Sequence, residues 1–243
     1  MVVALCTGRM YSGTRAVAHE LGLKGPVACV DGCQIVEARD HRTLFTASID
    51  PASTLSLGVL LGETRLATFA FSADKILYDR RGLPFLSYLR VWSDETRAVR
   101  DLTLPSAWSD LEDLAAVVAI GSEAEIRHVS AGIEEASPQR VQIVSFRLWQ
   151  RALAGNWALI VRRAGVDKGT ATRWLADYHG LSVSDVVAVG DWINDVPMFA
   201  VAGKSFAMAQ APEDVYSAAT FRLKASQETG GGIREAAERA GLL

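Results

Sequence analysis

The sequence predicts an α/β fold in which a parallel-sheet core is interrupted by an inserted second domain. Near both ends of the chain, apolar runs alternate with helical patterns, which is typical of parallel strands joined by helices. Residues 48–159 instead mix short alternating segments with apolar runs that are cut by prolines. The length of 243 residues allows one large domain or two modest ones. Together these observations favour two units, the second lying within the first.

In the first 47 residues we expect a strand, a helix and a hairpin in that order. The apolar run Val2 to Leu5 is typical of a parallel strand that is buried on both faces. A helix should follow from about Tyr11 to Leu21. Val27 to Val30 and Gln34 to Val36 are further apolar segments, and the turn dipeptide Asp31-Gly32 separates them, so they predict a short hairpin or a bent strand.

After the insertion the alternation of helix and strand returns. The expected elements are a helix Gly169 to His179, a strand Val186 to Val189, a helix Val196 to Ala202, a strand Ser205 to Met208, a helix that begins near Pro212 and a last helix after Gly230-Gly231-Gly232. We therefore assign residues 1–47 and 160–243 to a discontinuous core and residues 48–159 to the inserted domain.

Charge and hydropathy exclude two classes of partner. The 25 Lys and Arg against 28 Asp and Glu give a net charge of −3, which provides no large positive field to hold a nucleic acid backbone. No segment approaches the roughly 20 apolar residues that a membrane helix needs, and the opening run Val2 to Cys6 is too short for a signal peptide. We therefore expect a soluble cytoplasmic protein that binds neither nucleic acid nor a membrane.

The three cysteines predict reduced thiols. Cys6, Cys29 and Cys33 are odd in number and lie in apolar surroundings, which suits buried thiols in a reducing compartment better than a disulfide framework. The spacing of Cys29 and Cys33 is wrong for a zinc knuckle, and no histidines pair at ligand spacing. A metal-thiolate site is therefore not expected.

Two carboxylates follow the strand Val186 to Val189. Asp191 lies at the carboxyl edge of the sheet, where α/β proteins hold their ligands. Asp195 comes four residues later, so in a helical turn the two side chains share one face, and a hard cation such as Mg²⁺ would relieve this like-charge pair. The alternative is that an Asp caps the next helix. Asn194 is either an amide donor to a phosphate oxygen or a turn residue.

Two other segments have features of an anion site. Thr7-Gly8-Arg9 puts a hydroxyl and a bare backbone between a strand and a helix, where free N–H groups favour a phosphate, although such turns also occur for structural reasons alone. Lys168 stands at a helix start, where the helix dipole disfavours a cation, and a bound anion would explain its position. The alternative for Lys168 is a solvated side chain.

Taken in order, these segments resemble the haloacid dehalogenase superfamily of phosphohydrolases, in particular its Cof-type members with a type IIB cap. Thr7-Gly8-Arg9 resembles the second motif of the family, Gly165 to Gly169 the third, and Gly190 to Phe199 the fourth. Ala207-Met208 and Glu228-Thr229-Gly230 resemble landmarks farther downstream. The resemblance implies a Rossmann-like parallel-sheet core with an inserted α+β cap domain, and it is poorest within the cap.

The resemblance also implies roles for individual residues. Lys168, Asp191 and Asp195 would be catalytic. Asp191 would be a ligand of Mg²⁺, and Asp195 would hold the coordination shell of the metal. The transferring phosphoryl group would be bound by Thr7, Gly8, Lys168 and Asn194. The implied function is a Mg²⁺-dependent phosphatase that acts on a small phosphorylated metabolite such as a sugar phosphate.

The chain departs from the family pattern at the first motif. Family members carry Asp-x-Asp-Gly at the end of an opening strand, with the first Asp as nucleophile and the second as acid/base, whereas these 243 residues contain no Asp-x-Asp. The nearest imitation, Val27 to Gly32, has Cys29 in place of the nucleophile and follows the second motif. At Asp31-Gly32 the family commonly carries Asn-Gly. Either the printed start is internal to a longer protein, or the chain has lost hydrolysis and is a non-catalytic phosphometabolite-binding or interaction module.

The absent motif has a consequence for the sheet. In the family the first strand lies between the strand that leads to Thr7 and the strand that leads to Asp191, so without it two buried edges lack hydrogen-bond partners. Either these two strands close up to a spacing of about 4.8 Å, or the gap is filled by another segment or by self-association with a second chain. We expect filling, because a closed sheet would pull Thr7 and Asp191 out of the geometry that one phosphate needs.

Overall fold

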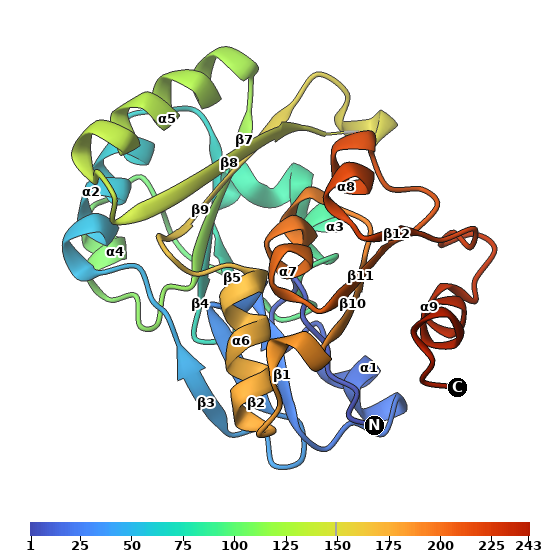
Figure 1. Ribbon diagram of the computed structural model, residues 1–243. Coiled ribbons are helices and arrows are strands. Elements are labelled where there is room, and N and C mark those ends of the chain that lie inside the picture. Colours follow the sequence, from blue (N-terminus) through green and yellow to red (C-terminus); the bar gives the residue numbers. More distant parts are fainter. Residues whose placement is uncertain (149) are drawn as a thin grey trace.

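The computed structural model describes residues 1–148 and 150–243, whose strands form three sheets (Figure 1). The antiparallel sheet near the N-terminus consists of β1 (Pro26–Cys29), β2 (Gln34–Glu37) and β3 (Thr43–Thr46). The parallel sheet near the C-terminus has the order β10 (Val187–Gly190), β11 (Lys204–Ala207) and β12 (Phe221–Arg222). A six-stranded sheet separates the two in sequence, so the predicted α/β fold with an inserted α+β domain is confirmed.

The C-terminal sheet is covered on both faces. The helices of this half are α6 (Lys168–Tyr178), α7 (Val196–Val201), α8 (Glu213–Ala218) and α9 (Gly232–Ala240). On one face, Met198 of α7 and Val215 of α8 share a hydrophobic cluster with Ala207. On the other face, Ala236 of α9 packs with Phe206. The helices and strands predicted for this half are therefore present within a few residues of their expected bounds.

The inserted domain is built on the six-stranded sheet. Its strands are β4 (Ala67–Ser72), β5 (Lys75–Tyr78), β6 (Thr96–Ala98), β7 (Ala116–Gly121), β8 (Val141–Arg147) and β9 (Trp157–Arg163), in the order β6-β5-β4-β7-β9-β8. Its helices are α2 (Pro51–Gly62), α3 (Leu86–Leu89), α4 (Ser106–Ser109) and α5 (Glu123–Ala136). α2 and α5 lie on one face of this sheet (Figure 1). Because β9 pairs with β7 up to Arg162 and with β8 up to Arg163, the expected domain boundary after residue 159 falls inside a strand.

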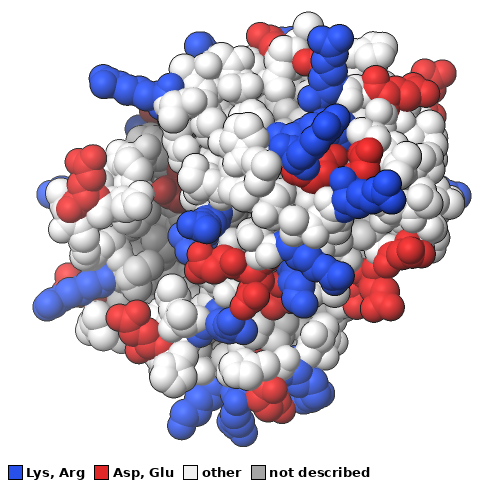
Figure 2. Space-filling view, turned by 180° about the vertical axis from the view of Figure 1, so that it is seen from behind, with Lys and Arg blue, Asp and Glu red and all other residues white. Residues whose placement is uncertain are grey.

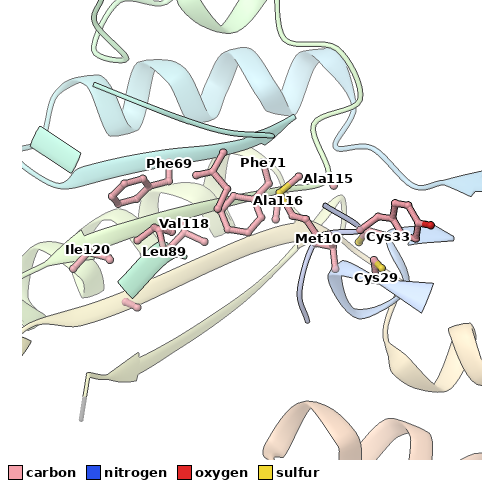
Figure 3. Close-up of a cluster of buried hydrophobic side chains, with 14 of the residues drawn as sticks. Met10, Cys29, Cys33, Phe69, Phe71, Leu89, Ala115, Ala116, Val118 and Ile120 are labelled. Atoms are coloured by element: carbon pink, nitrogen blue, oxygen red, sulfur yellow. The ribbon is translucent and has the colours of Figure 1, made fainter. Parts of the chain in front are cut away.

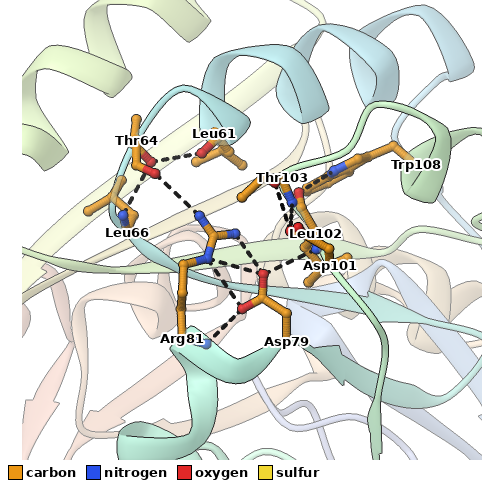
Figure 4. A network of polar contacts seen from close by, with 9 residues as sticks. All are labelled: Leu61, Thr64, Leu66, Asp79, Arg81, Asp101, Leu102, Thr103 and Trp108. Atoms are coloured by element: carbon orange, nitrogen blue, oxygen red, sulfur yellow. Dashed lines mark hydrogen bonds and ion pairs between the residues drawn. The ribbon is translucent and has the colours of Figure 1, made fainter.

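A buried carboxylate joins the loops at one side of the inserted domain (Figure 4). Asp79 is 3% exposed and accepts hydrogen bonds from the side chain of Arg81 and from the backbone N–H of Leu102, the latter at 3.1 Å. The Arg81 guanidinium also donates to the carbonyl of Thr64 at 3.3 Å, and Trp108 Nε1 donates to the carbonyl of Leu102 at 2.9 Å. These bonds link three segments: the one before β4, the one after β5 and the one before α4.

The other face of the six-stranded sheet is turned towards the first segment of the chain (Figure 3). Phe69 and Phe71 of β4 share one hydrophobic cluster with Met10, Cys29 and Cys33, all of them almost fully buried. The inserted domain and the start of the chain therefore have a hydrophobic core in common.

The first segment departs from the prediction at its opening strand. Val2 to Leu5 is not a strand, and Val2 and Val3 are 52% and 56% exposed instead of buried. Pairing begins only where the backbone N–H of Ala28 donates to the carbonyl of Leu5 at 2.9 Å and that of Thr7 donates to the carbonyl of Ala28 at 2.8 Å. The prediction is wrong because an apolar run carries no information about whether neighbouring elements cover it.

The first helix is shorter than the predicted range Tyr11 to Leu21. α1 spans only Arg15–Glu20. The residues before it contact the inserted domain, where the backbone N–H of Met10 donates to the carbonyl of Trp92 at 2.9 Å, and an added Cβ on Gly13 would collide with the same carbonyl. This contact takes the place of the predicted first turns of the helix.

The paired segment Leu5 to Thr7 and strand β10 have not closed up into neighbours. Within the described residues, β10 pairs with β11 alone, and the one bridge of Cys6 is to Ala28. Cys6 instead packs between the two, against the cluster of Ala188 and against that of Ala28. Side-chain contacts rather than backbone hydrogen bonds thus connect the two strands.

It stays a prediction that another segment or a second chain pairs with the edge of β10 that faces away from β11. Backbone N–H groups of Val187–Gly190 that point away from β11 are protected from hydrogen exchange only when another strand pairs with them. We expect mass spectrometry to find this protection, rising with protein concentration if a second copy supplies the strand and independent of concentration if another segment does. Rapid exchange of these amides at every concentration would contradict filling.

Acidic and basic side chains are interspersed on the face seen in Figure 2, in keeping with the small net charge. Within residues 1–148 and 150–243, no helix combines the length and the hydropathy needed to cross a membrane.

Candidate active site

Four segments of the chain meet beside a cavity of about 460 Å³, and three of them contribute polar side chains. Gly8 follows the segment that pairs with β1, and Asp31 lies in the turn after β1. Lys168 begins α6, and Asn194 lies in the loop after β10. These segments are far apart in sequence, and the fold brings them together at the carboxyl end of β10, the edge at which α/β proteins hold ligands.

The turn after β1 has a strained backbone. Val30, Asp31 and Gly32 have φ angles of 48°, 53° and 103°, a left-handed region that favours glycine and disfavours a β-branched residue such as valine. A Cβ on Gly32 would lie 2.9 Å from the carbonyl oxygen of Asp167, so the turn packs tightly against the start of α6. Backbone strain of this kind is concentrated at functional sites in proteins.

This turn places Asp31 at the centre of the cluster. Asp31 is 7% exposed, and its carboxylate forms an ion pair with Arg162 of β9 and accepts a hydrogen bond from Asn194 Nδ2 at 2.7 Å. Lys168 Nζ lies 3.9 Å from the same carboxylate. Because Arg162 belongs to the six-stranded sheet, the ion pair connects the inserted domain to the core.

Lys168 is held by a second carboxylate. It is 6% exposed, and its Nζ donates to Asp195 Oδ1 at 2.6 Å. Asp167 caps α6 by accepting from the backbone N–H of Thr170 at 2.8 Å, and the Thr170 hydroxyl accepts from the N–H of Asp167 at 3.0 Å. The carboxylate of Asp195 therefore stabilises the Lys168 ammonium at the start of a capped helix. The alternative, that the Lys168 side chain is solvated, is wrong.

Asp195 organises the loop that carries Asp191. Its Oδ2 accepts from the backbone N–H groups of Asp191 at 2.8 Å and Trp192 at 3.0 Å. Although Asp195 precedes α7, its side chain makes no capping hydrogen bond to that helix. A Cβ on Gly190 would lie 2.5 Å from the Asp195 carboxyl carbon, so the absence of a side chain at Gly190 makes room for the carboxylate.

Gly190→Ala tests this arrangement. The added methyl group should displace the Asp195 carboxylate from the N–H groups of Asp191 and Trp192 and lower the free energy of unfolding by about 1–3 kcal/mol, as overpacking usually does. Gly25→Ala is the matched control, because its Cβ would meet only His179 at an ordinary 3.4 Å. Chemical denaturation that gives the two variants equal stability would contradict this role of Gly190.

Asp191 is the carboxylate that could ligate a metal. Its Oδ2 accepts from Gln210 Nε2 at 2.8 Å, and within the described residues no bond to its Oδ1 is found. No group of three or more His, Cys, Asp and Glu side chains in residues 1–148 and 150–243 has the arrangement of a metal site. Mg²⁺ is commonly held by one or two carboxylates together with water and a substrate phosphate. This donor chemistry therefore fits Mg²⁺ with Asp191 as one ligand, whereas both oxygens of Asp195 are already engaged.

The remaining predicted residues divide into two groups. An added Cβ on Gly8 would lie 3.4 Å from Asp31 Oδ1 and 3.6 Å from Asn194 Nδ2, so Gly8 borders the cluster. The Thr7 hydroxyl accepts from the backbone N–H of Arg9 at 3.2 Å and stabilises the turn. The structure thus gathers Gly8 and Asn194 with Lys168 and Asp195, whereas Thr7 is not among the residues that line the cavity.

The sequence analysis missed two residues of the cluster, Asp31 and Arg162. In the sequence, Asp31 reads as part of a turn, although a carboxylate that directly follows a buried strand is a signal for a site. Arg162 shares a strand face with Ile160, and a cation in such an apolar face is a similar signal. Burial lowers the pKa of Arg162 to about 10, with Asp167 opposing the shift, so Arg162 is charged at neutral pH.

The thiols are unsuited to act as nucleophiles. All three cysteines are free, and Cys29 is fully buried. Burial raises the pKa of Cys6 and of Cys33 to about 12, and it raises that of Cys29 further. Because the thiolate is the reactive form, Cys29 does not replace the aspartate nucleophile. The predicted burial is found for Cys29 and Cys33, whereas Cys6 is only partly buried.

Comparison with known proteins agrees with these motifs. A profile of the haloacid dehalogenase-like hydrolases matches residues 1–236. The phosphoglycolate phosphatase of Nitrosopumilus maritimus is 37% identical to this chain over 84 residues, which are 35% of the chain and 36% of the relative. The chain thus aligns with only about a third of the length of this protein.

Solved structures resemble the whole chain. A haloacid dehalogenase-like hydrolase from Bacteroides thetaiotaomicron has a TM-score of 0.79 at 20% identity, over 98% of this chain and 85% of that protein. A sugar phosphatase of subclass IIB of the same superfamily has a TM-score of 0.75 at 17% identity, over 100% of this chain and 86% of that protein. At these sequence identities the similarity shows the fold alone, and this fold is the predicted Cof-type fold. Since the family profile covers nearly the whole sequence, the chain belongs to the haloacid dehalogenase-like hydrolases.

Proposed function

We propose that the cluster around Lys168 is the phosphoryl-binding site of a Mg²⁺-dependent phosphatase for a small phosphorylated metabolite such as a sugar phosphate. One observation carries the proposal: a buried ammonium and the amide of Asn194 both lie beside Asp31 on the floor of one cavity. The names of similar proteins, phosphoglycolate phosphatase and sugar phosphatase, support a small phosphate ester as substrate.

The residues of the chain would bind and orient the phosphoryl group. An ammonium has three donors, so Lys168 can keep its hydrogen bond to Asp195 and still donate to a phosphoryl oxygen. Asn194 would turn its amide from Asp31 to a second oxygen, and Gly8 would let the backbone approach closely. Donors that are already in place stabilise the charge that develops on phosphoryl oxygens during transfer.

Asp191 would hold Mg²⁺, and Asp195 would act as a positioning residue. By fixing the backbone N–H groups of Asp191 and Trp192, Asp195 keeps the Asp191 carboxylate at the end of β10. A bound Mg²⁺ neutralises charge on phosphoryl oxygens. The mutual position of Asp191 and Lys168 thus depends on Asp195, which contacts the backbone of one and the side chain of the other.

The charge balance of the cluster predicts that phosphate binding requires the cation. The carboxylates Asp31, Asp167, Asp191 and Asp195 exceed the cations Arg162 and Lys168 by two, so the empty cluster disfavours a further anion. We expect isothermal calorimetry to detect inorganic phosphate binding with Mg²⁺ and at least about tenfold weaker binding with EDTA, an effect of about 1.4 kcal/mol.

Asp191→Asn should remove this dependence on Mg²⁺ without unfolding the protein, because the new amide oxygen can still accept from Gln210. Glu213→Gln, an exposed substitution of the same kind, should leave the dependence intact. Equal phosphate affinity with Mg²⁺ and with EDTA in the unmodified protein would contradict the assignment of a Mg²⁺ site to this cluster.

A further inference from the structure

The cavity beside Lys168 has two chemically different sides. Its floor carries the polar cluster of Gly8, Asp31, Asp167, Lys168 and Asn194, with Trp192 and Ile193 beside it. Its roof is the face of the six-stranded sheet that is turned away from α2 and α5. A phosphate ester is divided in the same way, into an anionic phosphoryl group and an organic group, and a volume of about 460 Å³ is within the range of small-molecule sites. The roof is therefore positioned to contact the organic group.

Strand register places the roof side chains in adjacent rows. The first row contains Phe71, Ala116, Arg162 and Gln142. The second row contains Val118, Ile160 and Val144. Side chains two residues apart on a strand share a face of the sheet, so these rows form one surface. Its only charged member is Arg162, and Gln142 is already engaged through its amide, which donates to the carbonyl of Val166 at 2.7 Å.

Aromatic rings complete this roof. The rings of Phe71 and Trp92 are in edge-to-face contact, with centroids 5.9 Å apart, and Phe146 lines the same cavity. Hydroxyl groups of a ligand placed against these rings would lose hydrogen bonds to water without replacement, at a cost in binding free energy. A flat apolar ring would instead bury its surface against Phe71, Trp92 and Phe146.

Arg162 provides the one polar anchor in this apolar roof. It is 6% exposed, and although its Nη1 pairs with Asp31, its buried Nε has no partner among the described residues. Buried donors without a partner are rare in folded proteins. An arginine presents its donors in a planar fork that matches a carboxylate or a carbonyl oxygen. Because Arg162 lines the cavity, a ligand oxygen that reaches its guanidinium could satisfy this donor.

We propose that the cavity selects a phosphate ester whose organic group is an apolar ring bearing a carboxylate or carbonyl oxygen, with Arg162 as the specificity-determining residue. The inference rests on the proposed phosphoryl-binding site, and within small phosphorylated metabolites it favours ring compounds with an acceptor over a sugar phosphate. The phosphoryl group lies on Lys168 and Asn194, the ring lies under Phe71 and Phe146, and the acceptor faces Arg162.

Binding of four stable probes in the presence of Mg²⁺ tests the inference by calorimetry. The probes are inorganic phosphate, methylphosphonate, phenylphosphonate and 4-phosphonobenzoate. We expect phenylphosphonate to bind at least about tenfold more tightly than methylphosphonate, because a buried ring removes apolar surface from water. The carboxylate of 4-phosphonobenzoate should add about a further fivefold through Arg162.

Two variants separate the contributions of the ring and of the acceptor. Arg162→Lys keeps a cation opposite Asp31 but loses the planar fork of donors. It should therefore abolish the affinity that the carboxylate of 4-phosphonobenzoate adds and retain the affinity that the phenyl ring adds. Phe146→Ser should abolish most of the gain from the ring, whereas Phe45→Ser, at an exposed position on β3 outside the cavity lining, should change neither. Circular dichroism verifies that each variant is folded.

The outcomes distinguish this inference from the proposed function. If inorganic phosphate binds but phenylphosphonate binds no more tightly than methylphosphonate, or if Arg162→Lys leaves the gain from the carboxylate intact, the inference is overturned and the phosphoryl site stands. If neither phosphate nor any phosphonate binds, the proposed function fails and the inference fails with it.

Discussion

The 243-residue chain is expected to hydrolyse generic phosphate esters several powers of ten more slowly than ordinary phosphatases, even with saturating Mg²⁺. Loss of the nucleophile typically has an effect of this size on enzyme turnover, and the chain contains no Asp-x-Asp from which the family takes its nucleophile. A phosphatase assay with a chromogenic ester, on the preparation used for phosphate binding, measures both properties. Binding without turnover would match the non-catalytic alternative for these 243 residues.

The carboxylates near the cavity floor do not offer a ready substitute. Asp31 pairs with Arg162 and accepts from Asn194, and Asp195 accepts from Lys168. A carboxylate that is held by charged and amide donors is stabilised in its ground state and is a weaker nucleophile. Of these two, Asp31 is the one that lines the cavity.

Rapid turnover would therefore direct attention to Asp31. If the chain hydrolyses esters at ordinary enzyme rates, and if Asp31→Asn abolishes this activity while the exposed substitution Asp110→Asn does not, Asp31 is the nucleophile and the expectation of slow hydrolysis is wrong. Retained activity in both variants would contradict a role for Asp31.

Lys168→Ala is expected to abolish phosphate binding and to lower the free energy of unfolding by about 3–5 kcal/mol. Both side chains of the Lys168–Asp195 pair are less than a tenth exposed, and removal of one partner from a buried ion pair leaves an uncompensated charge. Urea denaturation and phosphate calorimetry on the same variant measure the two effects. The exposed substitution Lys24→Ala should change stability by no more than about 0.5 kcal/mol.

A second variant separates binding from folding. Lys168→Met with Asp195→Leu removes both charges, so it should recover much of the stability that Lys168→Ala loses and still fail to bind phosphate. Phosphate affinity that equals that of the unmodified protein, in any variant that lacks Lys168, would show that the anion binds elsewhere.

The second half of the fold could be predicted from the sequence because its signals are local. α6 begins at Lys168 directly after an Asp that caps it, and β10 is a short apolar run that ends in glycine. Each pattern spans only a few residues, and the helices and strands around them are found near their expected positions. Asn194 and Asp195 could be assigned to one site for the same reason, since both follow β10.

The rest depends on contacts between distant segments. Val2 to Leu5 reads as a buried strand, but exposure depends on whether another strand lies beside it, which a local pattern does not encode. Asp31 reads as a turn residue because its partner Arg162 is more than a hundred positions away and belongs to the inserted domain. Charged pairs of this kind become evident only when the fold brings the two segments together.

The same limit explains why the residues selecting the organic group were missed. The roof of the cavity combines strands β4, β7, β8 and β9; β8 contributes Gln142, Val144 and Phe146, and each of the other strands contributes one or two side chains. On each strand these side chains follow the ordinary alternation of a sheet, so no single segment differs from a structural strand.

A crystal structure of the chain soaked with phosphate and Mg²⁺ tests the central claim most directly. The account predicts a phosphate within hydrogen-bond distance of Lys168 Nζ and Asn194 Nδ2, beside Gly8, with Mg²⁺ on the Asp191 carboxylate. Empty density at these atoms under saturating phosphate and Mg²⁺, or a phosphate bound elsewhere while Lys168 keeps only its bond to Asp195, would contradict it.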